Sequence, residues 1–207
     1  MGTLLRVDVS PRGAQSHSRR FADELVETLA GRCRLERTVV RDLGAGPAAP
    51  IDEGYVRAML AHATSGSAAG VPQLTLSEQL IGELEAAAVV VMSTPVHNYT
   101  VPASLKAWID QVVRVGRTFK TTAKGKVGSL RDRPTFVVAA TGGYFSEGPS
   151  RQPDFFTPYL DAIFATIGIV DVRHLRLEGL ARGDAAVSRA YAEARKTLST
   201  LCLPQCP

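Results

Sequence analysis

The sequence predicts an α/β fold, a doubly wound five-stranded parallel sheet with helices on both faces. Apolar segments of strand length alternate with amphipathic segments of helix length throughout the chain. Residues 86–92, AAAVVVM, form an unbroken apolar run, as expected for a strand that is buried on both faces. Polar loops follow the first, third and fourth strands, at the sheet edge where such folds bind ligands. Nothing divides residues 1–207, so we expect a single domain.

The first strand–helix–strand unit is predicted from its apolar spacing. Residues 4–9 form the first strand, and residues 35–42 alternate well enough for a second, outer strand. Between them, residues 18–29 place apolar side chains four residues apart on one helix face. Gly31 then provides a helix stop.

The second unit contains the central strand. Residues 43–72 are rich in Gly, Ala, Pro and Ser, which predicts irregular structure with one short helix at 55–63. Thr75 and Glu78 have the spacing of a capping box, which predicts a helix to about residue 85. The third strand is predicted at residues 88–92.

The remaining elements follow the same alternation. Pro102 begins a helix that extends to about residue 115. Residues 116–133 contain lysines and glycines, and we expect a mobile excursion there. The fourth strand, 134–140, precedes the final helices and strand, for which the predicted ranges are 156–167 (helix, stopped by Gly168), 170–177 (strand) and 184–201 (helix, capped by Asp184).

Composition excludes several classes of protein. The net charge is +4 and the pI about 9.1, but the arginines are scattered, which argues against nucleic-acid binding. No segment approaches the ~20 apolar residues of a membrane span, and the first residues lack a signal pattern, so we expect no membrane association and a cytoplasmic location. Cys33, Cys202 and Cys206 are too few for a disulfide framework, and a metal or redox role of the last two has weak support.

The loop after the first strand, SPRGAQSHS at residues 10–18, places serines before a helix N-terminus. Serine hydroxyls and free N–H groups there form a cradle for phosphate. Ordinary N-capping by Ser16 or Ser18 explains the same residues equally well. Neither G-x-G-x-x-G nor a P-loop is present, which disfavours a dinucleotide or a nucleoside triphosphate. A mononucleotide such as FMN fits better.

Two further loops reach the same place, because strand order 2-1-3-4-5 makes strands one, three and four neighbours. PVHNY at residues 95–99 offers backbone amides and flat side chains for a flavin ring, or is simply a strand-terminal turn. Gly142 and Gly143 would let the backbone approach a planar ligand, or form a tight turn. Together the three loops favour a ligand.

Long motifs then indicate a family. SPRGxxSxSR near the start, the block PVHNYxVPASLKAWIDQVVRVGRTF, TGGYFSEGP and TPYLDAIFATIGIVDV resemble FMN-dependent NADH:azoreductases and the related NAD(P)H:quinone reductases. The resemblance implies a flavodoxin-like homodimer with FMN near the subunit interface. The exposed-looking Trp108 and Phe155 are weak support for that dimer. It also implies electron transfer from NADH or NADPH through FMN to quinones or azo compounds in two steps. The basic, glycine-containing residues 116–133 are a candidate substrate flap, from the same or the partner subunit, and a solvated surface loop explains them equally well.

The resemblance also assigns site residues. The phosphate would contact the residues of the first loop: Ser10, Ser16, His17 and Ser18. The flavin would contact the other two loops: Pro95, Val96, His97, Asn98, Tyr99, Ala140, Thr141, Gly142 and Gly143. No side-chain nucleophile is implied, and His97 as a proton donor ranks below simple packing against the ring. His97 and Val96 stand where the family commonly has Tyr and Met, and Ala140-Thr141 replaces a Ser-Arg pair.

Two alternatives remain open. A flavodoxin-like electron carrier has no substrate of its own, but such carriers are typically strongly acidic, whereas this chain is basic. An FMN-binding module that has become a scaffold would be expected to lose the phosphate serines, which are present. Metal binding by His97 has little support, because no partner with ligand spacing lies nearby.

Overall fold

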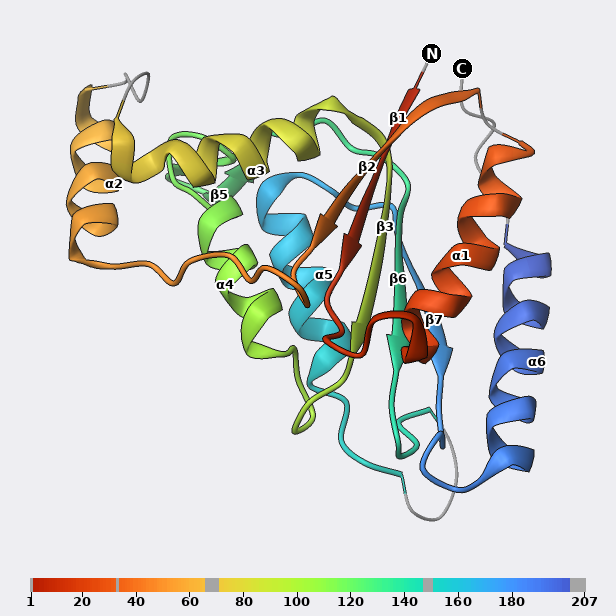
Figure 1. The fold of residues 1–207 in the computed structure, drawn as a ribbon. Helices are drawn as coiled ribbons and strands as arrows, with labels where there is room; N and C mark the ends of the chain where they lie inside the picture. Colours follow the sequence, from red (N-terminus) through yellow and green to blue (C-terminus); the bar gives the residue numbers. More distant parts are fainter. Residues whose placement is uncertain (1, 33, 66–70, 147–150, 202–207) are drawn as a thin grey trace.

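Five parallel strands form the central sheet of the computed structural model, in the order β2-β1-β3-β6-β7 (Figure 1). The structure describes residues 2–32, 34–65, 71–146 and 151–201. The strands are β1 (Gly2–Asp8), β2 (Leu35–Asp42), β3 (Ala87–Pro95), β6 (Thr135–Ala140) and β7 (Val172–Leu177). Since β6 and β7 are the fourth and fifth strands of the sheet, the predicted order 2-1-3-4-5 is confirmed. Cys33, Cys202 and Cys206 lie outside the described residues.

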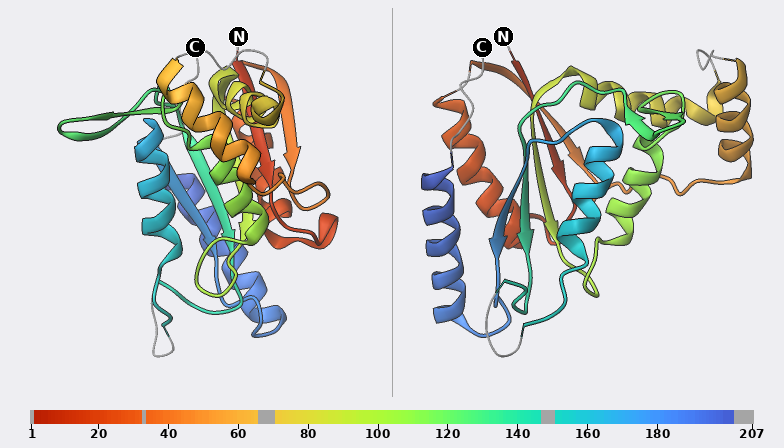
Figure 2. Two further views of the ribbon diagram at one scale, coloured as in Figure 1. Left: turned by 90° about the vertical axis from the view of Figure 1, so that its left-hand side faces the viewer. Right: turned by 180° about the vertical axis from the view of Figure 1, so that it is seen from behind.

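Helices cover both faces of the sheet, as predicted (Figure 2). One face carries α1 (His17–Ala30) and α6 (Asp184–Thr200). The other carries α3 (Thr75–Ala86), α4 (Ala103–Val112) and α5 (Phe156–Ile167). The helix α2 (Glu53–Ser65) stands away from the sheet, at the end of an extended segment.

Alternation along each strand divides the core into two layers. Leu5 and Val7 of β1 belong to the cluster under α3, α4 and α5, whereas Leu4 belongs to the cluster under α1 and α6. Successive side chains of a strand point to opposite faces, so a strand between two helical layers must be apolar at every position. The run in β3 meets this requirement: Val89 and Val90 are both fully buried, on opposite faces.

Trp108 on α4 is buried, with only 1% of its surface exposed. It belongs to the core cluster between α4 and the sheet. The sequence expectation that it lies on an exposed face was therefore wrong, because the apolar stripe of α4 turns it inward. Phe155 is exposed, as expected, at 60%.

Two predicted helix caps were wrong. Thr75 is the first residue of α3 and has helical backbone angles, while Leu74 occupies the N-cap position. Glu78 does not close a capping box, because it forms ion pairs with Arg114 and Arg117. At α6 the N-cap is Gly183, and Asp184 contributes a negative charge to the first turn.

The segment between α4 and β6 contains regular secondary structure that was not predicted. Residues 116–133 contain an antiparallel hairpin of β4 (Phe119–Thr122) and β5 (Gly125–Gly128). Gly128 packs against the end of α5, where an added Cβ would lie 2.1 Å from the Gly168 nitrogen. The Leu130 N–H donates to the Ile167 carbonyl at 3.0 Å. The excursion is therefore attached to the core.

All five strands of the sheet point to one edge, at the bottom of Figure 1, where the loops after β1, β3, β6 and β7 meet. The β4–β5 hairpin lies at the opposite end of the sheet, beside the end of α5 (Figure 1). It therefore does not cover the ligand edge of its own chain. Among the described helices, none is long and apolar enough to span a membrane.

Candidate functional site

An open pocket of about 770 Å³, which we call the edge pocket, lies where these loops converge. Its volume, which includes open solvent at the mouth, is in the range of small-molecule sites. The lining comes from four loops, in chain order: Ser10, Arg12, Ser16, His17, Pro95, Val96, His97, Ala140, Thr141, Gly142, Leu180 and Ala181. The described residues of this lining include basic side chains and no carboxylate, which suits an anionic ligand.

The first loop combines helix capping with the shape of a cradle. Ser16 is the N-cap of α1, and its hydroxyl accepts from the Arg19 N–H at 3.4 Å. It also lies 3.0 Å from the Ser18 hydroxyl, which is fully buried. The capping interpretation is therefore confirmed for Ser16. It leaves the phosphate interpretation open, since the first turn of the helix still presents N–H groups toward the pocket.

Arg19 fixes the position of this loop. Its guanidinium donates to the Ser10 carbonyl from Nη2 at 2.6 Å and from Nε at 3.1 Å. It also donates from Nη1 to Asp42 at the end of β2, at 2.7 Å. This hydrogen bond is the main reason that the pKa of Asp42 lies below its usual range. Gly44 packs against the same carbonyl, because an added Cβ would lie 2.2 Å from the Ser10 oxygen.

The buried ends of β1 and β3 support the same loop. Asp8 is only 4% exposed and accepts a hydrogen bond from the Ser93 hydroxyl at 2.6 Å. Arg19 lies 3.7 Å from the Asp8 carboxylate. This network therefore connects the loop after β1 to the strand that leads into PVHNY, so the two loops are held in a fixed relation.

His17 lines the pocket with one defined tautomer. An Arg20 guanidinium nitrogen lies 2.9 Å from His17 Nδ1, and the Tyr191 hydroxyl lies 3.3 Å from it. A guanidinium can only donate, so Nδ1 accepts and the proton of the neutral ring is on Nε2. Burial, and then the charges of Arg20 and Arg12, lower the pKa of His17. The ring is therefore a neutral donor.

This environment predicts a pH effect on stability. The unfolded chain protonates His17 at its ordinary pKa of 6.5, whereas the folded chain does so only at lower pH. Protons therefore favour the unfolded state as the pH falls below 6.5. Between about pH 7.5 and about pH 5.5, the melting temperature of the FMN-free protein should fall less in His17→Gln than in the wild type. An equal fall in melting temperature with pH for the two proteins would contradict this assignment.

The PVHNY loop forms a tight turn. The His97 and Thr100 backbones exchange two hydrogen bonds of 3.0 Å, and Asn98 and Tyr99 have φ values of 48° and 69°. Such a pair of positive φ values is what a type I′ turn requires. Asn98 and Tyr99 are exposed and do not line the edge pocket, in contrast to Pro95, Val96 and His97.

The third loop is held by the strand beside it. The Thr141 N–H donates to the Leu177 carbonyl at 2.9 Å, and the Leu180 N–H returns to the Thr141 carbonyl at 3.1 Å. Gly143 does not line the pocket, and its missing side chain is explained by Gln152, whose Oε1 would lie 2.6 Å from an added Cβ. Gly142 is exposed and lines the pocket.

Nine of the thirteen predicted contact residues thus meet at one pocket, and Ser18, Asn98, Tyr99 and Gly143 do not line it. Sequence reasoning missed Arg12, Leu180 and Ala181. Arg12 lies inside the serine motif and could have been selected by its charge. Leu180 and Ala181 follow β7, whose loop carries no recognisable motif. Its proximity follows only from β7 being the neighbour of β6.

Comparisons with known proteins bear on the fold and the family of the chain. Residues 2–201 match the model of a family described as having a flavodoxin-like fold. The chain is 47% identical over 191 residues, 92% of this chain and 93% of the relative, to an FMN-dependent NADH:quinone oxidoreductase 2 of Cupriavidus pinatubonensis. It is 44% identical over 199 residues, 96% of this chain and 95% of the relative, to an FMN-dependent NADH:quinone oxidoreductase 4 of Pseudomonas fluorescens.

Solved structures show the same fold at lower sequence identity. A crystal structure of an azoreductase from Bacillus anthracis has a TM-score of 0.81 at 22% identity, covering 97% of this chain and all of that one. An FMN-dependent NADH-azoreductase from the same species, solved in complex with FMN, has a TM-score of 0.79 at 24% identity, with 98% and 100% covered. The resemblance inferred from the motifs is confirmed. The chain belongs to the flavodoxin-like family of the FMN-dependent NADH:quinone oxidoreductases.

Proposed function

We propose that this protein is an FMN-dependent NADH:quinone oxidoreductase that also reduces azo compounds. The observation that carries the proposal is the edge pocket itself. It joins a helix N-terminus with serine hydroxyls to the loops after β3 and β6, and no carboxylate is among its described lining residues. Close relatives named for this activity, at 44–47% identity over more than nine-tenths of the chain, support it.

The residues present fit FMN. Ser10, Ser16 and His17 would hold the phosphate at the start of α1, where the helix N-terminus and Arg12 favour a negative charge. Ser18, fully buried, would act through its contact with the Ser16 hydroxyl. When bound, FMN supplies the redox chemistry, accepting a hydride from the nicotinamide and passing two electrons to the acceptor.

The loops after β3 and β6 would position the ring. Pro95, Val96 and His97 line one side of the pocket, and Ala140, Thr141 and Gly142 line the adjoining side. Asn98, Tyr99 and Gly143 belong to the same loops, outside the lining of this structure, and would complete the site from the loop tips. These residues would bind and orient the ring and would exclude water from it. We assign no nucleophile, and His97 would pack against the ring.

We further propose that NADH and the acceptor occupy the same open face in turn, so that catalysis is ping-pong. Initial rates measured at several quinone concentrations while NADH is varied should give parallel double-reciprocal lines. Intersecting lines would show that both substrates bind together and would contradict this part of the proposal. The same assay with NADPH in place of NADH determines the nucleotide preference.

Of the wider assignments in this proposal, the homodimer rests on the family resemblance and the others rest on the sequence. A homodimer, a cytoplasmic location, a single functional domain and a substrate cover from the partner's β4–β5 hairpin stay predictions. A sedimentation measurement of the FMN-loaded protein tests the first of these. An electron carrier would lack NADH oxidation with a simple quinone as the only acceptor, and the kinetic assay therefore separates it from the enzyme.

A further inference from the structure

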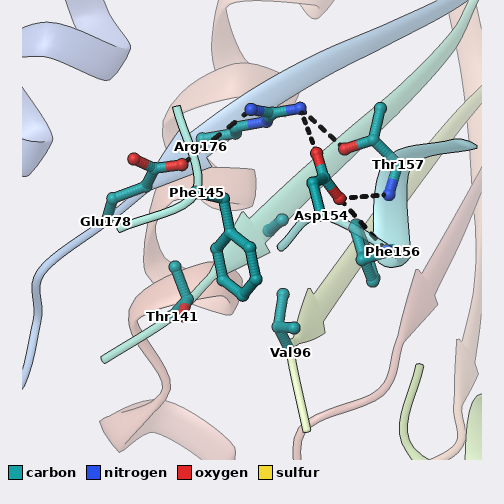
Figure 3. A pocket seen from close by; sticks show the side chains of 9 residues that line it. Val96, Thr141, Phe145, Asp154, Phe156, Thr157, Arg176 and Glu178 are labelled. Atoms are coloured by element: carbon teal, nitrogen blue, oxygen red, sulfur yellow. Dashed lines mark hydrogen bonds and ion pairs between the residues drawn. The ribbon is translucent and has the colours of Figure 1, made fainter. Parts of the chain in front are cut away.

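A second cavity, which we call the side cavity, adjoins the edge pocket on the α5 side of the sheet. Its empty space of about 230 Å³ includes open solvent at the mouth, and the enclosed part has room for about one water-sized group. It shares Val96 and Thr141 with the edge pocket. Ala139, Phe145 and Phe156 give it apolar walls. Figure 3 shows the Phe145 ring in the middle of this group, with Val96 and Thr141 beside it and charged side chains above.

Most polar groups of the side cavity satisfy one another. Asp154 lies just before the N-cap of α5, and its Oδ1 accepts from two N–H groups of the first turn, that of Phe156 at 3.1 Å and that of Thr157 at 2.8 Å. Its Oδ2 accepts from Arg176 at 2.9 Å. The same guanidinium nitrogen donates to the Thr157 hydroxyl at 2.7 Å (Figure 3). Both Asp154 carboxylate oxygens, the Thr157 hydroxyl and Arg176 Nη2 therefore have hydrogen-bond partners within the protein.

Glu178 is different, because one of its carboxylate oxygens lacks a hydrogen-bond donor among the described residues. Oε2 accepts from the Ser146 hydroxyl at 2.6 Å and from the Ser146 N–H at 3.3 Å. Oε1 is buried and has no hydrogen-bond partner among the residues that the structure describes, while the side chain as a whole is only 10% exposed. Its nearest cation, Arg176 Nη1, lies at 3.9 Å, beyond hydrogen-bond distance. A buried acceptor without a donor is costly, so this oxygen favours a ligand that donates.

The charges define what kind of donor fits. Among the described residues that line the cavity, Asp154 and Glu178 carry two negative charges and Arg176 carries a single positive charge, so these side chains oppose an anionic group. The basic phosphate end of the edge pocket lies at β1, and Glu178 follows β7, three strand spacings away. At about 4.8 Å per spacing, the two ends are roughly 14 Å apart. The negative end therefore lies far from the phosphate.

We propose that the side cavity is a subsite for a hydrogen-bond-donating substituent, a neutral hydroxyl or amino group, on the aromatic acceptor. Glu178 Oε1 receives the hydrogen bond, and Phe145 and Phe156 contact the ring edge that carries the substituent. The subsite selects acceptors with a donor and rejects acceptors with a carboxylate. This inference rests on the proposed function, since the shared Val96 and Thr141 place the subsite next to the site of electron transfer.

Three matched dyes test the subsite: 4-aminoazobenzene, azobenzene and azobenzene-4-carboxylate. Their kcat/KM values with NADH are measured for the FMN-loaded wild type, Glu178→Gln and Glu178→Met. Ratios between proteins cancel the intrinsic reactivity of each dye. We expect the preference for the amino dye over azobenzene to fall about tenfold in Glu178→Met, and the discrimination against the carboxylate to fall about tenfold in both variants. Glu193→Gln, an exposed glutamate on α6, is the charge-matched control and should change neither ratio.

Equilibrium binding gives a second readout that needs no turnover. The dissociation constants of the three dyes are measured without NADH, by dye absorbance, for FMN-loaded and FMN-free protein. Equal dye ratios in the wild type and both Glu178 variants would overturn the proposal and show that water alone satisfies Glu178. If the protein neither retains FMN nor oxidises NADH, the proposed function fails, while dye binding to the FMN-free protein still decides the subsite. Melting temperatures identify any variant that does not fold.

Discussion

Replacing Arg19 with methionine should weaken FMN binding at least about tenfold, corresponding to about 1.4 kcal/mol. The guanidinium is the group that fixes the Ser10 carbonyl, through two hydrogen bonds, and it connects that loop to Asp42. Methionine keeps much of the apolar volume and removes all of these donors. Ser10 then loses its fixed position at the phosphate end of the edge pocket, and Asp8 and Asp42 lose their shared cation.

The measurement is a fluorescence titration of FMN into the FMN-free protein. Arg19→Lys keeps the charge without the planar fork, so it should recover only part of the affinity. Arg57→Met is the matched control, because the Arg57 side chain is 77% exposed and its partner Glu53 is 86% exposed, a pair of little energetic value. FMN affinity in Arg19→Met equal to that of the control would show that the loop does not depend on Arg19.

Replacing Trp108 with alanine should lower the free energy of unfolding by about 3–5 kcal/mol. Its side chain is almost fully buried between α4 and the sheet, in the larger of the two core clusters. A cavity of this size cannot be filled by small shifts of neighbours in a close-packed core. Phe155→Ala is the comparison, since Phe155 is 60% exposed and its truncation should change stability by no more than about 0.5 kcal/mol.

Urea denaturation of both variants measures the two changes. An effect at Phe155 as large as the one at Trp108 would mean that Phe155 is covered in solution. This outcome would support the predicted dimer and locate its interface near the start of α5. A small effect at Trp108 would contradict the description of the α4 core.

The sheet could be predicted from the sequence because its strands are buried on both sides. The apolar run of β3 is continuous, so its assignment does not depend on an alternating pattern. The range predicted for β2 matches the structure. The β4–β5 hairpin could not be recognised, because each strand has only four residues and most of them are exposed and polar. What orders it is distant in sequence: the contact of Gly128 with Gly168 at the end of α5.

The same division explains the candidate site. Residues that directly follow β1, β3 and β6 could be predicted, since parallel strands bring their ends to one edge. The side cavity could not be predicted, because Arg176 has the pattern of an ordinary polar position on an outer strand and Glu178 directly follows that strand. Their role depends on Asp154, which lies twenty-two residues from Arg176 in sequence. The role of Arg19 could not be predicted for a similar reason, because Arg19 lies on α1 and its partner Asp42 lies at the end of β2.

We infer above all that the edge pocket holds FMN and that NADH can reduce this FMN. The most direct test is the visible absorption spectrum of protein desalted after incubation with FMN, followed without oxygen as NADH is added. We expect a flavin band that stays with the protein and bleaches on addition of NADH. A flavin band that neither NADH nor NADPH bleaches would indicate an electron carrier. Absence of any retained flavin would contradict the account and leave the edge pocket to a different ligand.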